Sequence, residues 1–173
     1  MKRPQSGFSL IELLTAITVL AVLLAMTVPG FRDFTRSNRV TAAHNDLVTA
    51  FTLARSEALK RATTVSVCAS NDGTSCTGAT NWAGGWIAFT DAGAAGAVNS
   101  AAGDTVLQTW PAINGDMTLS GTVAFVQYTA TGMVAPASAS TFDAYATGCT
   151  GSKLRRLTVS AIGSASGTTQ PCP

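Results

Sequence analysis

An apolar run from Phe8 to Val28, close to the start of the sequence, most constrains what this chain can fold into. One acid, Glu12, interrupts the run, and a short basic leader precedes it. As a helix rising ~1.5 Å per residue, the run would span about 32 Å, enough to cross a hydrocarbon layer of about 30 Å. An ionised carboxylate costs about 2.5 to 3.5 kcal/mol at the centre of that layer, so Glu12 needs a shallow position or a partner. The run therefore predicts a membrane-spanning helix with a functional acid.

Two ordinary explanations of the apolar run compete with a specialised one. A cleavable secretory signal usually has a shorter apolar region followed by a small-residue cleavage site, and residues 25–29 supply no convincing site. A plain signal anchor tolerates the run but gives no reason for a lone acid at Glu12, four residues after Phe8. Lys2 and Arg3 place the leader in the cytoplasm by the positive-inside rule, so everything after Pro29 is expected outside.

The residues Gly7, Phe8 and Glu12, set in GFSLIELLTAITVL, carry a family resemblance. They resemble the class III signal sequence of type IV prepilins. The resemblance implies that a prepilin peptidase cuts between Gly7 and Phe8, removes leader residues 1–7 and methylates the new amino terminus at Phe8. It also implies that the freed amine of one subunit meets Glu12 of a neighbour during assembly. Opposite charges that pair in a low-dielectric setting offset part of the desolvation each would suffer alone.

The segment 29–62 has the helical period and is predicted to continue the membrane helix as an amphipathic helix. A bend or a locally unwound stretch is expected at Pro29 and Gly30. The only histidine, His44, sits among polar neighbours and is expected to face solvent. The apolar residues, which should dock on a sheet, are Val40, Ala43, Leu47, Ala50, Phe51, Ala54, Ala58 and Leu59.

After Ala62 the helical period stops, and residues 63–173 are predicted to form one β-rich head. Length supports this, because 173 residues leave enough chain after the membrane segment for one domain with a sizeable core. The predicted fold class is α+β: a long N-terminal helix packed on an antiparallel β-rich head, in one sheet or split into two. Surface loops are expected at 92–103 and 135–140. The expected strands are Thr64 to Ala69, Trp86 to Thr90, Thr105 to Trp110, Met117 to Leu119, Val123 to Tyr128 and Leu154 to Ile162.

Three further stretches, FRDFTRSNRV, ARSEALKRATTVSVCAS and WAGGWIAFTD, resemble the GspH/FimT-type branch of pilin-like proteins. KLRRLTVSAIG is similar to the last strand of that family's head. The resemblance implies a minor type IV pilin, which supports twitching motility, adhesion or DNA uptake, or else a minor pseudopilin of type II secretion. Its implied partners are other pilins or pseudopilins, the prepilin peptidase and the bacterial inner membrane. The head is then periplasmic until the protein joins a pilus or pseudopilus.

Four cysteines, all after the apolar run, fit an oxidising compartment. Proximity in sequence favours pairing Cys68 with Cys76 and Cys149 with Cys172, although three pairings are formally possible. A zinc site is the alternative, but neither interval has the usual spacing of zinc ligands. No metal and no cofactor is expected.

Catalysis finds little support in the sequence, because there is a single histidine, no clustered acids in the head and no Gly-rich phosphate loop. The protein is therefore not expected to be an enzyme. The tryptophans Trp82, Trp86 and Trp110 could form a contact patch, but aromatic residues beside strands more often belong to a core. The aspartates expected to fall singly in turns and to cap backbone amides are Asp72, Asp91, Asp104, Asp116 and Asp143.

A basic cluster near the C-terminus, Lys153, Arg155 and Arg156, raises a second function class. Some FimT-type proteins bind DNA through a G-R-x-R motif after the last strand, and three close cations could neutralise phosphates in that area. Here the matching place, residues 163–166, reads GSAS, so both arginines of the motif are missing. The alternative is that the three cations are ordinary solvated charges beside a strand.

Overall fold

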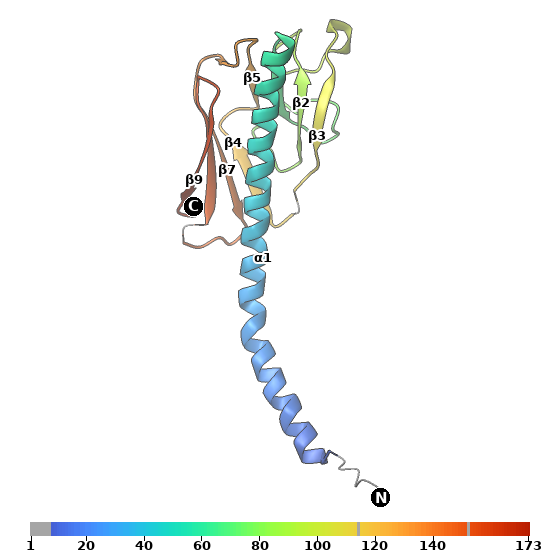
Figure 1. Ribbon diagram of the computed structural model, residues 1–173, viewed down its shortest axis with the longest axis vertical. Helices are drawn as coiled ribbons and strands as arrows, with labels where there is room; N and C mark the ends of the chain where they lie inside the picture. The colour runs from blue at the N-terminus through green and yellow to red at the C-terminus, as the bar shows by residue number, and fades with distance from the viewer. Residues whose placement is uncertain (1–7, 114, 152) are drawn as a thin grey trace, which may run out of the picture. The chain divides into compact units, whose positions relative to one another are not determined.

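Helix α1, Leu10–Arg61, is the first element of the chain (Figure 1). The computed structural model describes residues 8–113, 115–151 and 153–173, without the side chains of residues 25–30, 32 and 33. The backbone of α1 stays helical through Pro29 and Gly30, so the unwound stretch expected there is not found in the described backbone. Proline can kink a helix without ending it. The chain divides into an N-terminal unit that ends at Arg36 and a larger unit, Ser37–Pro173.

The part of α1 in the larger unit buries one face, as its sequence period predicts. Leu59 is the exception, because it was expected on this face and is 52% exposed. The helix ends where Ala62 adopts a positive φ of 52° and the backbone N–H of Thr63 donates to the carbonyl of Ala58. The buried residues, at steps of three and four, are Val40, Ala43, Leu47, Ala50, Phe51, Ala54 and Ala58.

Two antiparallel sheets form the head, and every strand pair in them is antiparallel. The first sheet has the order β3-β2-β1-β5-β6, with β1 Val65–Ala69, β2 Trp86–Thr90, β3 Val106–Trp110, β5 Phe125–Tyr128 and β6 Val134–Ala135. The second has the order β4-β7-β8-β9, with β4 Met117–Gly121, β7 Ser140–Ala146, β8 Leu154–Val159 and β9 Ala165–Gln170. A short 3-10 helix, Ser100–Ala102, lies between β2 and β3. This is the predicted α+β architecture, with the sheet split in two.

The structure adds three strands, β6, β7 and β9, that the sequence did not predict. The stretch KLRRLTVSAIG was expected to contain the last strand of the head, but β9 follows it as an exposed edge strand. The sequence of β9, ASGTTQ, is polar and small, so it has no apolar alternation to mark it as a strand. It is a strand because its backbone pairs with β8, from Leu154 opposite Gln170 to Val159 opposite Ala165.

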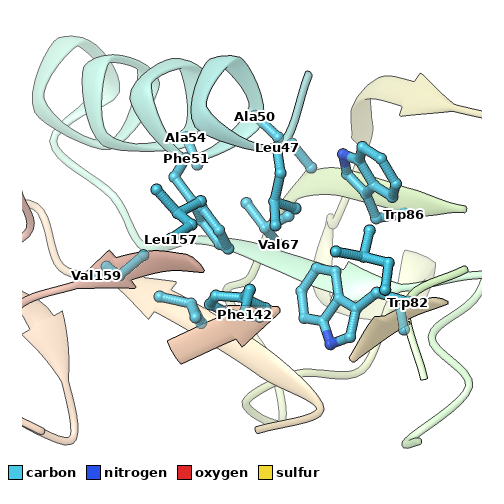
Figure 2. Close-up of a cluster of buried hydrophobic side chains, with 14 of the residues drawn as sticks. Leu47, Ala50, Phe51, Ala54, Val67, Trp82, Trp86, Phe142, Leu157 and Val159 are labelled. Atoms are coloured by element: carbon cyan, nitrogen blue, oxygen red, sulfur yellow. The ribbon is translucent and has the colours of Figure 1, made fainter. Parts of the chain in front are cut away.

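The core lies between α1 and the two sheets, and Figure 2 shows side chains from all three meeting there. The rings of Phe51, Trp82 and Phe142 pack together, with centroids 6.1, 5.0 and 4.9 Å apart. The buried Trp82 indole donates to the carbonyl of Val123 at 3.1 Å. Gly121 leaves room for this cluster, since a Cβ there would lie 2.7 Å from the Phe142 ring. Trp82 and Trp86 are buried, so they are core residues rather than a contact patch.

Candidate functional site

The N-terminal end of α1 is built around a capping contact. The backbone N–H of Glu12 donates to the Ser9 side-chain oxygen at 3.2 Å and to the Ser9 carbonyl at 3.1 Å. Ser9 thus acts as the N-cap, and Glu12 occupies the third helical position, as in the S-x-x-E capping box. Ser9 was not predicted as a cap, although the S-x-x-E pattern of residues 9–12 is a local signal for one.

Glu12 is exposed on the first turn of the helix. A carboxylate at this position is stabilised by the positive end of the helix dipole. It lies one turn from Phe8, whose side chain is 84% exposed. Gly7 and the leader residues, including Lys2 and Arg3, lie outside the described residues, so the structure shows only one side of the expected cleavage point.

The side chains of residues 8–24 are all exposed, and all but Ser9, Glu12, Thr15 and Thr18 are apolar. A helix that is apolar on all sides is stable when another apolar environment covers it. Among the described residues, no helix is both long enough and apolar enough to qualify as a membrane span. The exposed large apolar side chains of this surface are Phe8, Leu10, Ile11, Leu13, Leu14, Ile17, Val19, Leu20, Val22, Leu23 and Leu24.

The basic cluster does not form one surface. Arg155 and Arg156 are neighbours in β8, so their side chains point to opposite faces of the sheet. Arg156 lies opposite Asp143 of β7, and its guanidinium donates two hydrogen bonds of 2.7 Å to that carboxylate. Arg155 donates to the hydroxyl of Thr169 on β9. Lys153 is exposed just before β8.

The contact with Asp143 stabilises the charged form of Arg156. Hydrogen bonding to the carboxylate is the main cause that raises the pKa of Arg156, with the Coulomb attraction of Asp143 adding to it. Asp143 was expected in a turn, but it lies inside β7, where its partner is a cross-strand arginine rather than a backbone amide. The arginine is therefore already engaged within the sheet and is not poised for a phosphate.

Three of the other aspartates accept hydrogen bonds from loop backbone, as expected. Asp72 accepts from the amides of Thr74 and Ser75, both at 2.8 Å. Bonds from the Ser75 hydroxyl and from these amides lower the pKa of Asp72 well below its usual range. Buried Asp91 accepts from the amide of Gly96, and Asp104 accepts from the amides of Ala92 and Asn99.

The cysteines lie in the pairs that proximity favoured. Cys68 and Cys76 are joined with their Cα atoms 5.6 Å apart, and Cys149 and Cys172 with theirs 5.7 Å apart. The second bond ties the loop before β8 to the C-terminal end of the chain. Within residues 8–113, 115–151 and 153–173, no three histidine, cysteine or acidic side chains gather as a metal site would need.

His44 is half-buried, whereas it was expected to face solvent. Its ring packs against the backbone of β9 at Gly167. The space there is so small that a Cβ on this glycine would lie 2.7 Å from the His44 Nε2 atom. That nitrogen is buried and has no hydrogen-bond partner among the described residues. The difference arises because β9, which was not predicted, lies beside the His44 ring.

Comparisons with known proteins agree with this geometry. The family model for type II transport protein GspH matches residues 43–163, and the model for the prokaryotic N-terminal methylation motif matches residues 2–28. No curated protein matches the chain significantly.

Two crystal structures of the type IV minor pilin FimU from Pseudomonas aeruginosa PAO1 have a similar fold. Both have a TM-score of 0.57 and 23% sequence identity to this chain. The P21 crystal form covers 81% of this chain and 92% of its own, and the P65 form covers 74% and 91%. At this identity the likeness shows the fold: a pilin-like helix on antiparallel sheets.

Proposed function

The chain belongs to the GspH family of pilin-like proteins, and from that membership we propose that it is a minor type IV pilin that takes part in pilus assembly. Pilins and pseudopilins are structural proteins, so this chain is not an enzyme. In the proposal, a prepilin peptidase cuts between Gly7 and Phe8 and methylates Phe8. The match of residues 2–28 to the N-terminal methylation motif supports this processing.

The observation that carries the proposal is the exposed apolar surface from Phe8 to Leu24. In the proposal this surface first lies in the bacterial inner membrane, with the head in the periplasm. It then moves from lipid into the core of a filament, where helices of other pilins cover it and the apolar burial is retained. Pilus assembly of this kind would support twitching motility, adhesion or DNA uptake.

Glu12 gives the assembly step its specificity. Cleavage before Phe8 would create an amine beside the positive end of the helix dipole, where a cation is poorly placed. A carboxylate from a neighbouring subunit would compensate that charge, and Glu12 is exposed on the first turn, where it can reach such an amine. Pairing would offset the desolvation of both groups inside an apolar filament.

A minor pseudopilin of a type II secretion system is the second candidate, and the description of the matching family favours it. The structural likeness to the FimU minor pilin favours the pilus. Both assemblies use the same helix in the same way, so the N-terminal geometry does not separate them. The head then decides which partners are bound.

Recovery of the epitope-tagged chain from its native host tests the proposal. We expect the tagged chain in the sheared pilus fraction together with other pilins, and we expect its deletion to impair pilus-dependent motility. Co-purification with secretion-system components, together with a loss of secretion and normal motility, would favour the pseudopilin. Gly7→Phe should leave a larger, unprocessed band in either case, and normal processing of this variant would contradict the proposed cleavage.

A further inference from the structure

A second exposed apolar surface lies on the head, at the end where α1 finishes. Figure 1 shows the C-terminal end of α1, the end of β5 and the turn before β9 at this same end. Each of these segments carries an exposed apolar side chain: Leu59 of α1 at 52%, Met133 after β5 at 46%, and Ile162 before β9 at 63%. We call these three residues the distal rim.

Arg55 lies at the centre of the distal rim. Its Nη2 donates to the carbonyl of Ile162 at 3.2 Å. A Cβ at Gly132 would lie 3.2 Å from Leu59 and 3.3 Å from the Nε of Arg55, so the two turns close around the arginine. A Cβ at Gly163 would also lie 3.2 Å from that Nε.

Arg55 makes a hydrogen bond to the head, but within the described part of the chain its Nε lacks an acceptor. Its Nε is buried and has no hydrogen-bond partner among the described residues, and the same holds for the hydroxyl of buried Tyr128. Tyr128 lies beside Arg55 and feels its charge, while burial raises the pKa of Tyr128, so its hydroxyl keeps its proton. Two buried donors therefore lie together without an acceptor, which disfavours the isolated head.

Among the described residues, no carboxylate forms an ion pair with Arg55. Glu57, two residues further along α1, pairs instead with Lys60 at 3.4 Å and with Arg61 at 2.6 Å. The distal rim thus surrounds a cation that lacks a counter-ion, at an end of the head that already carries Lys60 and Arg61. Arginine set among apolar side chains is the composition of the energetically dominant part of a protein interface.

We propose that the distal rim and Arg55 form a docking site for a neighbouring filament subunit that presents a carboxylate among apolar side chains. This inference rests on the proposed function for the identity of the partner. A small anion would neutralise Arg55 but would leave Leu59, Met133 and Ile162 uncovered. A protein surface covers the rim and brings a counter-ion at the same time, because its carboxylate can accept hydrogen bonds from the terminal nitrogens of the Arg55 guanidinium, which are not buried as the Nε is.

Photo-crosslinking in whole cells tests the site with the full chain. A photoreactive residue at Ile162 should crosslink to another subunit, within a peptide that contains Asp or Glu. The same residue at Gln108, exposed on the edge strand β3, gives the background. A yield at Ile162 no higher than at Gln108, an adduct with lipid or nucleic acid, or a crosslinked peptide without an acid would each overturn the proposal.

Arg55→Met separates docking from folding, because methionine keeps much of the apolar stem and removes the charge. We expect the crosslink to fall at least tenfold while the melting temperature stays the same or rises, since unsatisfied donors are removed. Lys60→Met, at the same end of α1, is the matched control and should keep the crosslink. An unchanged yield in Arg55→Met, or a crosslink lost together with a lower melting temperature, would contradict a docking role.

Charge reversal provides the last check. Arg55→Glu should abolish the crosslink, and changing the partner's acid to arginine should restore it. Failure of that rescue would overturn the pairing. Absence of the chain from sheared filaments counts against the proposed function, whereas a chain that is present there but makes no crosslink at Ile162 counts against this inference alone.

Discussion

Asp143 and Arg156 show how strand register decides what a charged residue does. In the sequence, Lys153, Arg155 and Arg156 form one basic cluster. In the structure, β7 lies beside β8, so that Arg156 meets Asp143 while Arg155 points to the other face. Because β7 was not predicted, its pairing with the cluster could not be predicted either.

The separation of these cations leads to a prediction about DNA. We expect the chain to show no retardation of duplex DNA in a gel-shift titration at low salt, where phosphate contacts are strongest. Arg155→Ala with Arg156→Ala should behave like the unaltered chain. Retardation that the double variant abolishes would show instead that the two arginines act together on phosphates.

Asp72 supplies a prediction about pH. Its folded pKa is lowered by hydrogen bonds from Ser75 and Thr74, so its ionised form stabilises the fold above the unfolded pKa of 3.8. That stabilisation is lost as pH falls below this value, through the lower folded pKa. Asp72→Asn should therefore melt at a lower temperature than the unaltered chain at pH 7, and the gap should narrow below about pH 3.8.

Ser75→Ala provides the companion measurement for Asp72. It removes the hydroxyl that donates to the Asp72 carboxylate at 2.6 Å, so part of the same gap should appear at pH 7. A gap of equal size at pH 7 and pH 3 would mean that the ionised carboxylate is not what stabilises the loop.

At the scale of elements, apolar periodicity made α1 and most strands predictable. The buried face from Val40 to Ala58 has the helical period, and β2 has the bounds predicted for it, Trp86–Thr90. The strands β6 and β9 were not predictable in this way, because one has two residues and the other is polar and exposed. Such strands form because a neighbour offers them hydrogen bonds, and sequence patterns do not record the neighbour.

The candidate sites likewise differ in whether a local sequence pattern reveals them. The N-terminal residues Gly7, Phe8 and Glu12 are identified by a local pattern, whereas the cap at Ser9 was found only in the structure. The distal rim could not be predicted, because it joins α1 to two turns that are distant in the sequence. Leu59 fits the apolar period of α1, yet the structure places it at the end of the packed face, where its side chain is 52% exposed.

The packing of α1 on the sheets can be tested at Phe51. This ring contacts both Trp82 and Phe142, so Phe51→Ala should lower the free energy of unfolding by about 3–5 kcal/mol through lost burial and a cavity. Chemical unfolding of the chain in detergent measures the change. Leu53→Ala, on a half-buried position of the same helix, should cost less. Equal losses for the two variants would contradict the central place of Phe51.

The whole molecule combines a packed head with a helical segment whose apolar side chains are exposed. A large exposed apolar surface is unusual for a protein that acts alone and is typical of one that is covered by a membrane or by partners. In the proposed function, membrane lipid buries this surface first, and the helices of other filament subunits bury it after assembly. It also explains why a single acid lies on the first turn of an otherwise apolar segment.

Glu12→Ala tests the role of that acid in assembly. We expect membrane insertion to be unchanged, because the variant is more apolar, and we expect much less of the chain in sheared filaments. Immunoblots of membrane and filament fractions measure both quantities. Glu12→Asp, which keeps the charge, should retain part of the incorporation, and full incorporation of Glu12→Ala would show that the acid is not the docking point.

The N-terminus of the chain purified from its native host tests the central claim most directly. Mass spectrometry of the N-terminal peptide should find a methylated amine on Phe8, with leader residues 1–7 removed and the apolar helix retained. A chain that still begins at Met1, or one cut after Val28 so that the helix is lost, would contradict the account.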